Sequence, residues 1–488
     1  MILRSNEINW EVDVVRESNK FLRLGIEGLD KILGDFISPP YTMVIAGHPG
    51  SGKTTMASTI CYSNALKGYR CLYISLQEDR EKLYKYMSML GLDLEKTESA
   101  GFLRFVKIPM TLDIEGVSEA ISKFVSEDYD VVVLDSVNPL LDILEKDSEK
   151  RSWLQNFFYT ISRVINGLLI LIAEMPYGSE SLELGSIEFV SDAVLILKHR
   201  KEEGFLVRTL EIRKARGAPI LLAEMPISIR EGKGIEVWVP TILDEVVEAG
   251  EELELPCSLL RKTLNHIHKG MVINITYPPD SDYIDLAIML LGLAVKENMK
   301  LLFISYKYPP VSIRDALVRS LVNKGFNKDL SERLVKNHVV FKSINPFSYS
   351  VSQLVARELT IIEELDPHIV VFHGVEIPRH TTSVSDHIRE LYNQMNYLKK
   401  LGKIVVRIGA YTDDFSYKLE SRVADVIVRF EYEGSEGNIG FRAYLWRRFK
   451  QPYVAISKEM YECIEETVSL IRELTTVASE SVTLTSSD

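Results

Sequence analysis

Residues 47–54 read GHPGSGKT, in which glycines, a lysine and a threonine have the spacing that holds phosphate groups. Gly50 and Gly52 let the backbone turn its N–H groups inward, and the helix expected next adds the positive end of its dipole. Lys53 is expected to reach the β- and γ-phosphates of a nucleotide, and Thr54 to offer its hydroxyl to Mg²⁺. The predicted phosphate-binding residues are Gly47, His48, Pro49, Gly50, Ser51, Gly52, Lys53, Thr54 and Thr55.

A carboxylate suited to the same metal ion follows the apolar run VVVL. Asp135 ends this run, 82 residues after Lys53. The tip of a buried strand beside a phosphate loop is where Mg²⁺ and its waters need a ligand. Thr54 and Asp135 are therefore the predicted metal residues.

Hydrolysis also needs a group that orients and polarises the attacking water. Glu78, in the segment SLQED, follows a second apolar run and could act as this base, with Gln77 beside it. The alternative is that Glu78 and Asp79 only enrich the first turn of the next helix with acidic side chains. Glu174, which closes the run LILIAE, is expected to be solvated.

Two cations lie at the end of a late strand-like run, in the segment RKARG. Lys214 and Arg216 are two residues apart, so on a strand they share one face and could point at one anion. Supplied by a neighbouring subunit, they would act as an arginine finger. The alternative is an exposed strand end with solvated charges.

The elements that carry these residues follow the pattern of a parallel α/β sheet, with apolar runs alternating with helical segments. The runs 41–46, 71–75, 131–134 and 168–173 predict buried strands, and residues 55–66 and 80–90 predict helices. Residues 194–197 and 206–212 predict a hairpin, with the cluster His199, Arg200 and Lys201 solvated in its turn.

The second half of the chain repeats this order. Ser305 matches Ser75, His373 matches Asp135 and Asp425 matches Asp192, at offsets that stay between 230 and 238 residues. We interpret this as a tandem duplication. The fold class predicted is α/β, with two tandem domains that each hold a mainly parallel sheet flanked by helices. The predicted domains are residues 1–244 and 245–470, with an acidic linker within 241–256 and a frayed Ser/Thr-rich tail at 471–488.

Length and composition agree with this organisation. A chain of 488 residues, 46% hydrophobic, has room for two large domains and excludes a disordered protein or a disulfide scaffold. The net charge of −12 means that nucleic-acid binding would need a local basic patch. No apolar leader or membrane-length run occurs, and the four cysteines lie far apart, so we expect a cytoplasmic protein with reduced thiols and no structural zinc. His373, His380 and His387 lack supporting ligand patterns and are expected to be satisfied or exposed.

The ordered segments of the first half carry a family resemblance. FLRLGIEGLDKIL, GHPGSGKTT, YISLQED, YDVVVLDS, EFVSDAVLIL and RTLEIRKARG follow one another within residues 21–240. Together they resemble the KaiC-like branch of the RecA-type P-loop ATPases, which includes clock-type proteins, recombination mediators and regulators of archaeal gas vesicles. The resemblance implies a RecA-type core, ATP and Mg²⁺ as cofactors, and a homo-oligomeric ring, often a hexamer, with nucleotide between subunits.

The resemblance also assigns roles to single residues. It implies that Gln77 replaces the first of two adjacent acidic residues and that Glu78 keeps the second, so turnover is expected to be slow. It further implies that Lys214 and Arg216 belong to a Lys-x-Arg-Gly segment that reaches a neighbour's nucleotide.

The second half departs from the clock-type pattern at every catalytic position. Asp280 and Asp282 replace loop glycines and would repel a triphosphate, while Tyr283 and Ile284 stand where Lys53 and Thr54 stand in the first half. His373 replaces the metal carboxylate, and Lys307-Tyr308 replaces Gln77-Glu78. Only Arg448 and Lys450 still match the late cations. We expect a folded second domain without catalysis or autophosphorylation.

Three functions remain open at this point. The first is a Mg²⁺-dependent ATPase with one working site per chain, acting as a regulatory or signalling ring through protein partners. The second is a DNA recombination or repair ATPase, which the acidic charge does not favour. The third is a nucleotide-binding scaffold without hydrolysis.

Overall fold

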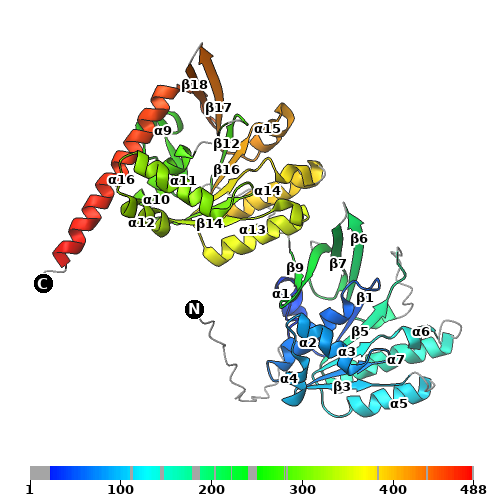
Figure 1. Cartoon of the computed structure of the whole chain (residues 1–488). Coiled ribbons are helices and arrows are strands. Elements are labelled where there is room, and N and C mark those ends of the chain that lie inside the picture. Colours follow the sequence, from blue (N-terminus) through cyan, green and yellow to red (C-terminus); the bar gives the residue numbers. More distant parts are fainter. Residues whose placement is uncertain are drawn as a thin grey trace. The chain divides into compact units, whose positions relative to one another are not determined.

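The chain divides into two compact units, Met1–Val239 and Pro240–Asp488 (Figure 1). The boundary lies five residues before the one we expected from the sequence. The computed structural model describes residues 22–109, 114–142, 148–177, 187–202, 205–220, 223–239, 250–279, 281, 284–381, 384–435 and 438–485.

A nine-stranded sheet forms the centre of the first unit, in the order β3-β2-β4-β5-β1-β6-β7-β8-β9. The strands from β3 to β6 in this order are parallel, and β7, β8 and β9 are added antiparallel. Their bounds are β1 (Tyr41–Gly47), β2 (Cys71–Ser75), β3 (Leu103–Lys107), β4 (Val131–Asp135), β5 (Leu168–Glu174), β6 (Ala193–Glu202), β7 (Phe205–Ala215), β8 (Glu224–Arg230) and β9 (Gly234–Val237).

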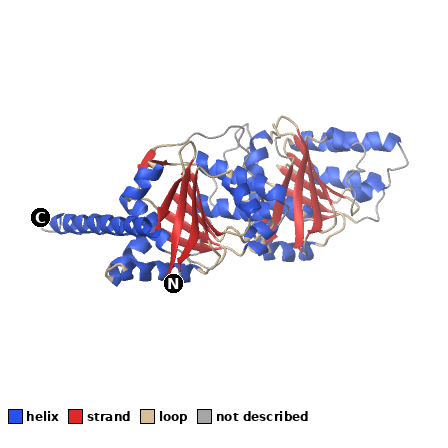
Figure 2. Cartoon of the chain, turned by 90° about the horizontal axis from the view of Figure 1, so that it is seen from above, coloured by secondary structure: helices blue, strands red, loops and turns tan. Residues whose placement is uncertain are grey.

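Helices cover both faces of this sheet (Figure 2). Every residue of β1 is buried because its side chains alternate between two cores. Met43 packs in the core that contains Met56 of α2, and Val44 packs in the core that contains Phe158 of α7. The helices are α1 (Glu27–Leu33), α2 (Lys53–Ala65), α3 (Arg80–Met89), α4 (Leu94–Ser99), α5 (Ile114–Val125), α6 (Asn138–Asp142), α7 (Ser148–Ile165) and α8 (Ile187–Val190).

The sheet of the second unit repeats the strand order of the first. Its order β14-β13-β15-β16-β12-β17-β18-β19 matches that of the first sheet from β3 to β8. The bounds are β12 (Val272–Tyr277), β13 (Leu301–Ser305), β14 (Val339–Ser343), β15 (Ile369–His373), β16 (Ile404–Ala410), β17 (Val426–Ser435), β18 (Asn438–Arg447) and β19 (Tyr453–Ile456). A separate two-stranded ribbon joins β10 (Glu252–Glu254) to β11 (His266–His268).

Strand registers and single hydrogen bonds are repeated as well. Ser75 pairs with Asp135 in the first sheet, and Ser305 pairs with His373 in the second. The Asp192 carboxylate accepts a hydrogen bond from the backbone N–H of Thr42 at 2.9 Å. Asp425 accepts the equivalent bond from Val272, also at 2.9 Å. The two units therefore share one α/β architecture, as the sequence repeat predicted.

Eight helices are described in the second unit, and they again form two cores, one on each face of the sheet. The helices are α9 (Ser258–Leu264), α10 (Asp285–Lys296), α11 (Pro310–Asn323), α12 (Lys328–His338), α13 (Val351–Leu365), α14 (Val384–Lys400), α15 (Asp414–Ser421) and α16 (Ser457–Thr485). The last helix corrects one expectation: residues 471–485, which we expected to be a frayed tail, continue α16.

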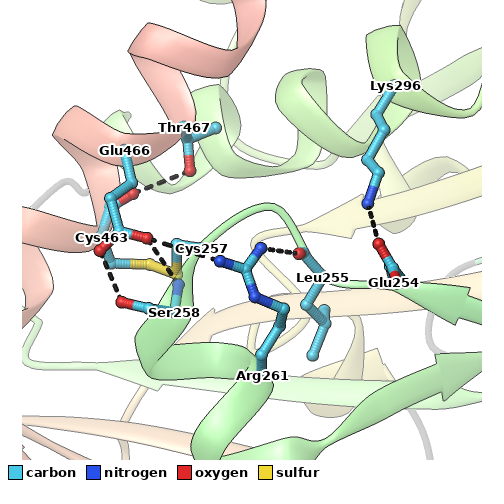
Figure 3. Close-up of polar contacts among 9 residues, drawn as sticks. All are labelled: Glu254, Leu255, Cys257, Ser258, Arg261, Lys296, Cys463, Glu466 and Thr467. Atoms are coloured by element: carbon cyan, nitrogen blue, oxygen red, sulfur yellow. Dashed lines mark hydrogen bonds and ion pairs between the residues drawn. A yellow bond between two sulfur atoms is a disulfide. The ribbon is translucent and has the colours of Figure 1, made fainter.

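A disulfide joins α16 to the start of α9 (Figure 3). Cys257 and Cys463 are 206 residues apart in sequence, with Cα atoms 5.1 Å apart. We expected reduced thiols because the cysteines show no close spacing, and that expectation was wrong for this pair. Cys61 and Cys71 are free and buried. Among the described helices, none has the length and apolar character needed to cross a membrane.

Candidate functional site

The loop between β1 and α2 has a shape that only glycine accommodates at two positions. Gly47 and Gly52 have φ angles of 155° and 109°, which L side chains rarely adopt. A Cβ atom on Gly47 would lie 2.1 Å from the carbonyl oxygen of Leu197, and one on Gly52 would lie 2.7 Å from a methyl carbon of Ile229. The predicted loop is therefore formed, with α2 beginning at Lys53.

Lys53 is buried beneath this loop. Its ammonium group donates hydrogen bonds to the carbonyl oxygens of Gly47 and His48, both at 3.0 Å. Burial lowers the pKa of Lys53, and the negative charges of Glu174 and Asp135 oppose this shift. The loop thus holds a cation in place at the point where the motif predicts phosphate.

The predicted metal residues meet at the same edge of the sheet. The Thr54 hydroxyl donates to the Asp135 carboxylate at 3.0 Å, and the Tyr73 hydroxyl donates to the same oxygen at 2.5 Å. Burial raises the pKa of Asp135, while these two hydrogen bonds and the charge of Lys53 oppose the rise. A hydroxyl and a carboxylate in contact provide the oxygen ligands that suit Mg²⁺.

The strand order explains why residues so distant in sequence meet. Strand β5 lies between β4 and β1, and all three are parallel, so their carboxyl ends share one edge. Gly47 pairs with Glu174, and Asp135 pairs with Ile172. Ligands of open α/β sheets bind in the crevice outside this edge. Glu174 is exposed there, as expected.

Sequence comparisons relate the first unit to known proteins. A family model described as "ATPase: KaiC" matches residues 22–241. Over these residues the first unit is similar to KaiC ATPase domains. The circadian clock oscillator protein KaiC of Parathermosynechococcus lividus is 24% identical over 205 residues, which are 42% of this chain and 38% of that relative. The chain thus spans about two fifths of the length of the KaiC relatives it matches.

Shorter archaeal proteins match over nearly their whole length. A UPF0273 protein of Pyrococcus horikoshii is 26% identical over 256 residues, which are 48% of this chain and 98% of the relative. A UPF0273 protein of Aeropyrum pernix is 25% identical over 255 residues, which are 48% of this chain and 98% of that relative. These relatives are similar in extent to one unit of this chain.

Glu78 is held by its backbone in a turn after β2. The Ser75 hydroxyl accepts a hydrogen bond from the Glu78 N–H at 2.8 Å and donates to the Glu78 carbonyl at 2.9 Å. The Glu78 carboxylate forms an ion pair with Lys82, one helical turn later, at 2.5 Å. Gln77 is exposed. The role of Glu78 as a base stays a prediction, since its carboxylate is paired with a lysine in this structure.

Lys214 and Arg216 lie at the opposite edge of the sheet from the phosphate loop. Ala215 pairs with Ala193, which pairs with Met43 at the start of β1. Met43 precedes Gly47 by four residues, or roughly 13 Å along a strand. Lys214 donates to the backbone carbonyl of Glu188 at 2.6 Å, and Arg216 pairs with Asp192 at 3.2 Å. The structure therefore does not bring these two cations to their own chain's loop.

One ring cluster beside the phosphate loop was missed by the sequence analysis. His48 contacts the rings of His199 and Tyr177, with ring centroids 5.5 and 5.4 Å apart. Both ring nitrogens of His48 are buried without a hydrogen-bond partner among the described residues. Burial, then the nearby His48, lowers the pKa of His199. We expected His199 in a solvated turn because of its charged neighbours, but β6 extends through it to Glu202.

The equivalent edge of the second unit has lost these groups. Ile284, Phe303 and His373 occupy the positions of Thr54, Tyr73 and Asp135, and they line a cavity of about 280 Å³. The turn itself persists, because the Ser305 hydroxyl accepts a hydrogen bond from the N–H of Tyr308 at 2.9 Å. Asp280, Asp282 and Tyr283 lie outside the described residues.

Arg448 in the second unit occupies the position of Arg216 in the first: its N–H donates to the Asp425 carbonyl at 3.1 Å, as that of Arg216 donates to Asp192 at 2.8 Å. Arg448 follows β18 and donates to the backbone carbonyl of Ala424 at 3.0 Å. Arg447 pairs with Val426 at the start of β17, so Arg448 also lies at the amino edge of the parallel strands. A cation is therefore retained at this edge of the second unit, at Arg448.

Proposed function

We propose that this chain is a Mg²⁺-dependent ATPase with one working site, in residues 1–244, and that it acts as a homo-oligomeric regulatory or signalling ring. The observation that carries the proposal is the meeting of Lys53, Thr54 and Asp135 at one edge of the sheet, below a loop that requires glycine. This combination provides a cation for the phosphates and oxygen ligands for the metal ion.

The residues present fit both cofactors. Within the described part of the chain, the Lys53 ammonium donates to the loop carbonyls of Gly47 and His48, which a nucleotide's β- and γ-phosphates would replace as acceptors. Thr54 and Asp135 would hold Mg²⁺, whose charge neutralises the negative charge that develops during phosphoryl transfer. Once its ion pair with Lys82 is broken, the Glu78 carboxylate would orient and deprotonate the attacking water.

A ring is supported by the placement of Lys214 and Arg216. They lie at the amino edge of β1, and in a head-to-tail ring each subunit offers that edge to another subunit's nucleotide. Both cations are held in position by bonds to Glu188 and Asp192. A regulatory role agrees with relatives named circadian clock oscillator proteins, and the altered second edge suits a domain that responds to nucleotide bound elsewhere.

One observation favours a second function, a nucleotide-binding scaffold without hydrolysis. The carboxylate of Glu78, the candidate base, is engaged in an ion pair with Lys82, and Gln77 provides no second carboxylate. The two functions share the binding site and differ only in turnover.

ATP binding by the full chain tests the proposal. We expect Lys53→Ala to weaken binding of a fluorescent ATP analogue at least tenfold, because a buried charge-assisted contact is lost. Lys85→Ala, a change at an exposed lysine of α3, is the matched control. Equal affinity of Lys53→Ala and the wild type would overturn the assignment. Phosphate release by the wild type, with and without Mg²⁺, then separates the ATPase from the scaffold.

A further inference from the structure

Two histidines and a glutamate lie together on the ribbon that begins the described part of the second unit. Strands β10 and β11 are antiparallel, and Glu252 is directly opposite His268. His266 and His268 are two residues apart, so they point to the same face of the ribbon. The register therefore gathers three metal-binding side chains on one face of two short strands.

The other face of the ribbon explains why this register is fixed. Leu253 and Ile267 pair with each other and are buried in the core of the second unit. A shift of one residue would expose both apolar side chains and bury the polar ones, which is unfavourable. The donor-bearing face thus remains outward and accessible to a small ion.

The donor atoms are close enough to share one ion. Nε2 of His266 lies 2.9 Å and Nε2 of His268 lies 4.0 Å from the same carboxylate oxygen of Glu252. One donor atom from each of the three residues can be chosen so that all lie within 4.8 Å of one another. Ligand atoms around a tetrahedral zinc ion are roughly 3.3 Å apart, so side-chain rotations that move the donor atoms by up to roughly 1.5 Å would complete the site.

A backbone contact orients one of the two imidazoles for binding. Nδ1 of His268 lies 3.1 Å from the carbonyl oxygen of Gly250, which can only accept, so Nδ1 carries the proton. In the neutral imidazole the lone pair then lies on Nε2, the nitrogen 4.0 Å from the Glu252 carboxylate. Histidines that bind metal ions usually donate their second N–H to a carbonyl or carboxylate in this way.

Neighbouring groups set the number of ligands at three. Glu254 is opposite His266, but its carboxylate is held by Lys296 at 2.8 Å (Figure 3). Nδ1 of His266 lies 2.9 Å from the amide nitrogen of Asn265, which donates to it. With the amide turned over, its oxygen would accept from Nδ1–H instead and leave Nε2 free to bind the ion. Arg447 donates to the backbone carbonyl of His266 at 2.6 Å and holds the strand.

We propose that Glu252, His266 and His268 bind a divalent transition-metal ion, Zn²⁺ in the first instance, with a fourth position open to water. Two imidazoles and one carboxylate suit Zn²⁺ and related ions, while Mg²⁺ and Ca²⁺ prefer oxygen ligands. This site is separate from the magnesium residues of the first unit. The ion would tie β10 to β11 and so close the segment that carries α9 and Cys257.

Zinc binding by the full, nucleotide-free chain tests this proposal. The protein is purified without a polyhistidine tag, treated with EDTA and desalted, and Zn²⁺ is titrated against a chromogenic chelator. We expect one Zn²⁺ per chain, a rise in melting temperature, and visible Co²⁺ absorption typical of tetrahedral nitrogen and oxygen ligands. The variant His266→Ala/His268→Ala should lose at least 100-fold in affinity.

Matched variants keep the result interpretable. Glu254→Gln changes a carboxylate on the same face of the ribbon and should leave zinc affinity unchanged. Lys53→Ala should also bind one Zn²⁺, which separates this site from the nucleotide site. Should the double histidine variant fold poorly, Glu252→Gln with the Co²⁺ spectrum replaces it. Equal zinc affinity of the wild type and the ligand variants, or no binding at micromolar zinc, overturns the proposal.

Discussion

Thr54 and Asp135 are 81 residues apart in sequence and share a hydrogen bond of 3.0 Å at the carboxyl edge of the first sheet. The bond joins the start of α2 to the end of β4, so the hydroxyl and the carboxylate are already together in the ligand-free chain. As the proposed Mg²⁺ site, this arrangement would need little reorganisation on binding the ion, which is the condition for efficient electrostatic stabilisation.

Removal of the Asp135 charge should separate metal use from nucleotide binding. Asp135→Asn keeps an acceptor for Thr54 and Tyr73, so the fold should be retained. We expect Mg²⁺-dependent phosphate release to fall by about 10²-fold, because a metal ligand is lost. Nucleotide affinity measured in EDTA should change little. Asp130→Asn, at the other end of β4, should behave like the wild type; equal loss in both variants would contradict this role for Asp135.

The Glu78–Lys82 pair makes the two proposed functions distinguishable. With Glu78 as the base, Glu78→Gln should bind ATP normally and lose about 10²–10⁴-fold in turnover. Lys82→Ala removes the ion pair and should leave turnover equal or higher. Measured by phosphate release, near-background rates that are equal in all three proteins would favour the scaffold.

Mixed rings test whether Lys214 and Arg216 act on a neighbour. Lys53→Ala lacks a working site but keeps the cationic edge, whereas Lys214→Ala/Arg216→Ala keeps the site and lacks the edge. Each alone should be inactive. Random assembly of equal amounts places a complete site at about a quarter of the interfaces, so activity should recover to that extent. Arg213→Ala, one strand position away and paired with Glu211, is the control. Failure of every mixture to recover would argue against action in trans.

A buried acid should give the second unit a measurable pH dependence. Glu358 accepts hydrogen bonds from Tyr306 and Gln394, and burial raises its pKa to about 7. The folded state then binds the proton more tightly than the unfolded state, so this contribution is present in full below about pH 4.5 and is lost as the pH rises through 7. Its size is at most on the order of 3 kcal/mol.

His387 acts in the opposite direction, since burial lowers its pKa to about 4. The free energy of unfolding therefore rises with pH between about pH 4 and 6.5 because of His387, and this rise partly offsets the loss caused by Glu358. Glu358→Gln removes only one of the two. We expect the difference in melting temperature, Glu358→Gln minus wild type, to be larger at pH 8 than at pH 5, because only the wild type loses the Glu358 contribution. Parallel curves for the two proteins would show that Glu358 does not titrate in this range.

The disulfide should stabilise the second unit alone. Reduction of Cys257–Cys463 should lower the free energy of unfolding by about 2–4 kcal/mol, because the unfolded chain gains freedom. The melting transition of the second unit should shift with reductant, whereas ATP binding by the first should not. The variant Cys257→Ser/Cys463→Ser should be insensitive to reductant; a similar shift in this variant would assign the effect to another cause.

The sequence was most informative where chemistry depends on neighbours along the chain. The loop around Lys53 and the strand ending in Asp135 were predictable because each motif is local. The match of His373 with Asp135 was also predictable, because a repeat preserves order, and the strand registers confirm it.

What the sequence did not predict depends on contacts between distant segments. Cys257 and Cys463 form a pair that no spacing rule detects across 206 residues. Glu252 reaches His268 only because a ribbon closes around α9. Charged neighbours made His199 resemble a turn residue, although pairing with β7 extends the strand through it.

The position of Lys214 at the far edge of its own sheet has a consequence for how the proposed activity depends on dilution. A site that receives its last cations from another molecule is complete only when two molecules meet. Its rate per chain would then rise with the amount of protein and fall away in dilute solution. The activity of such an ATPase would therefore depend on its own concentration as well as on any other signal.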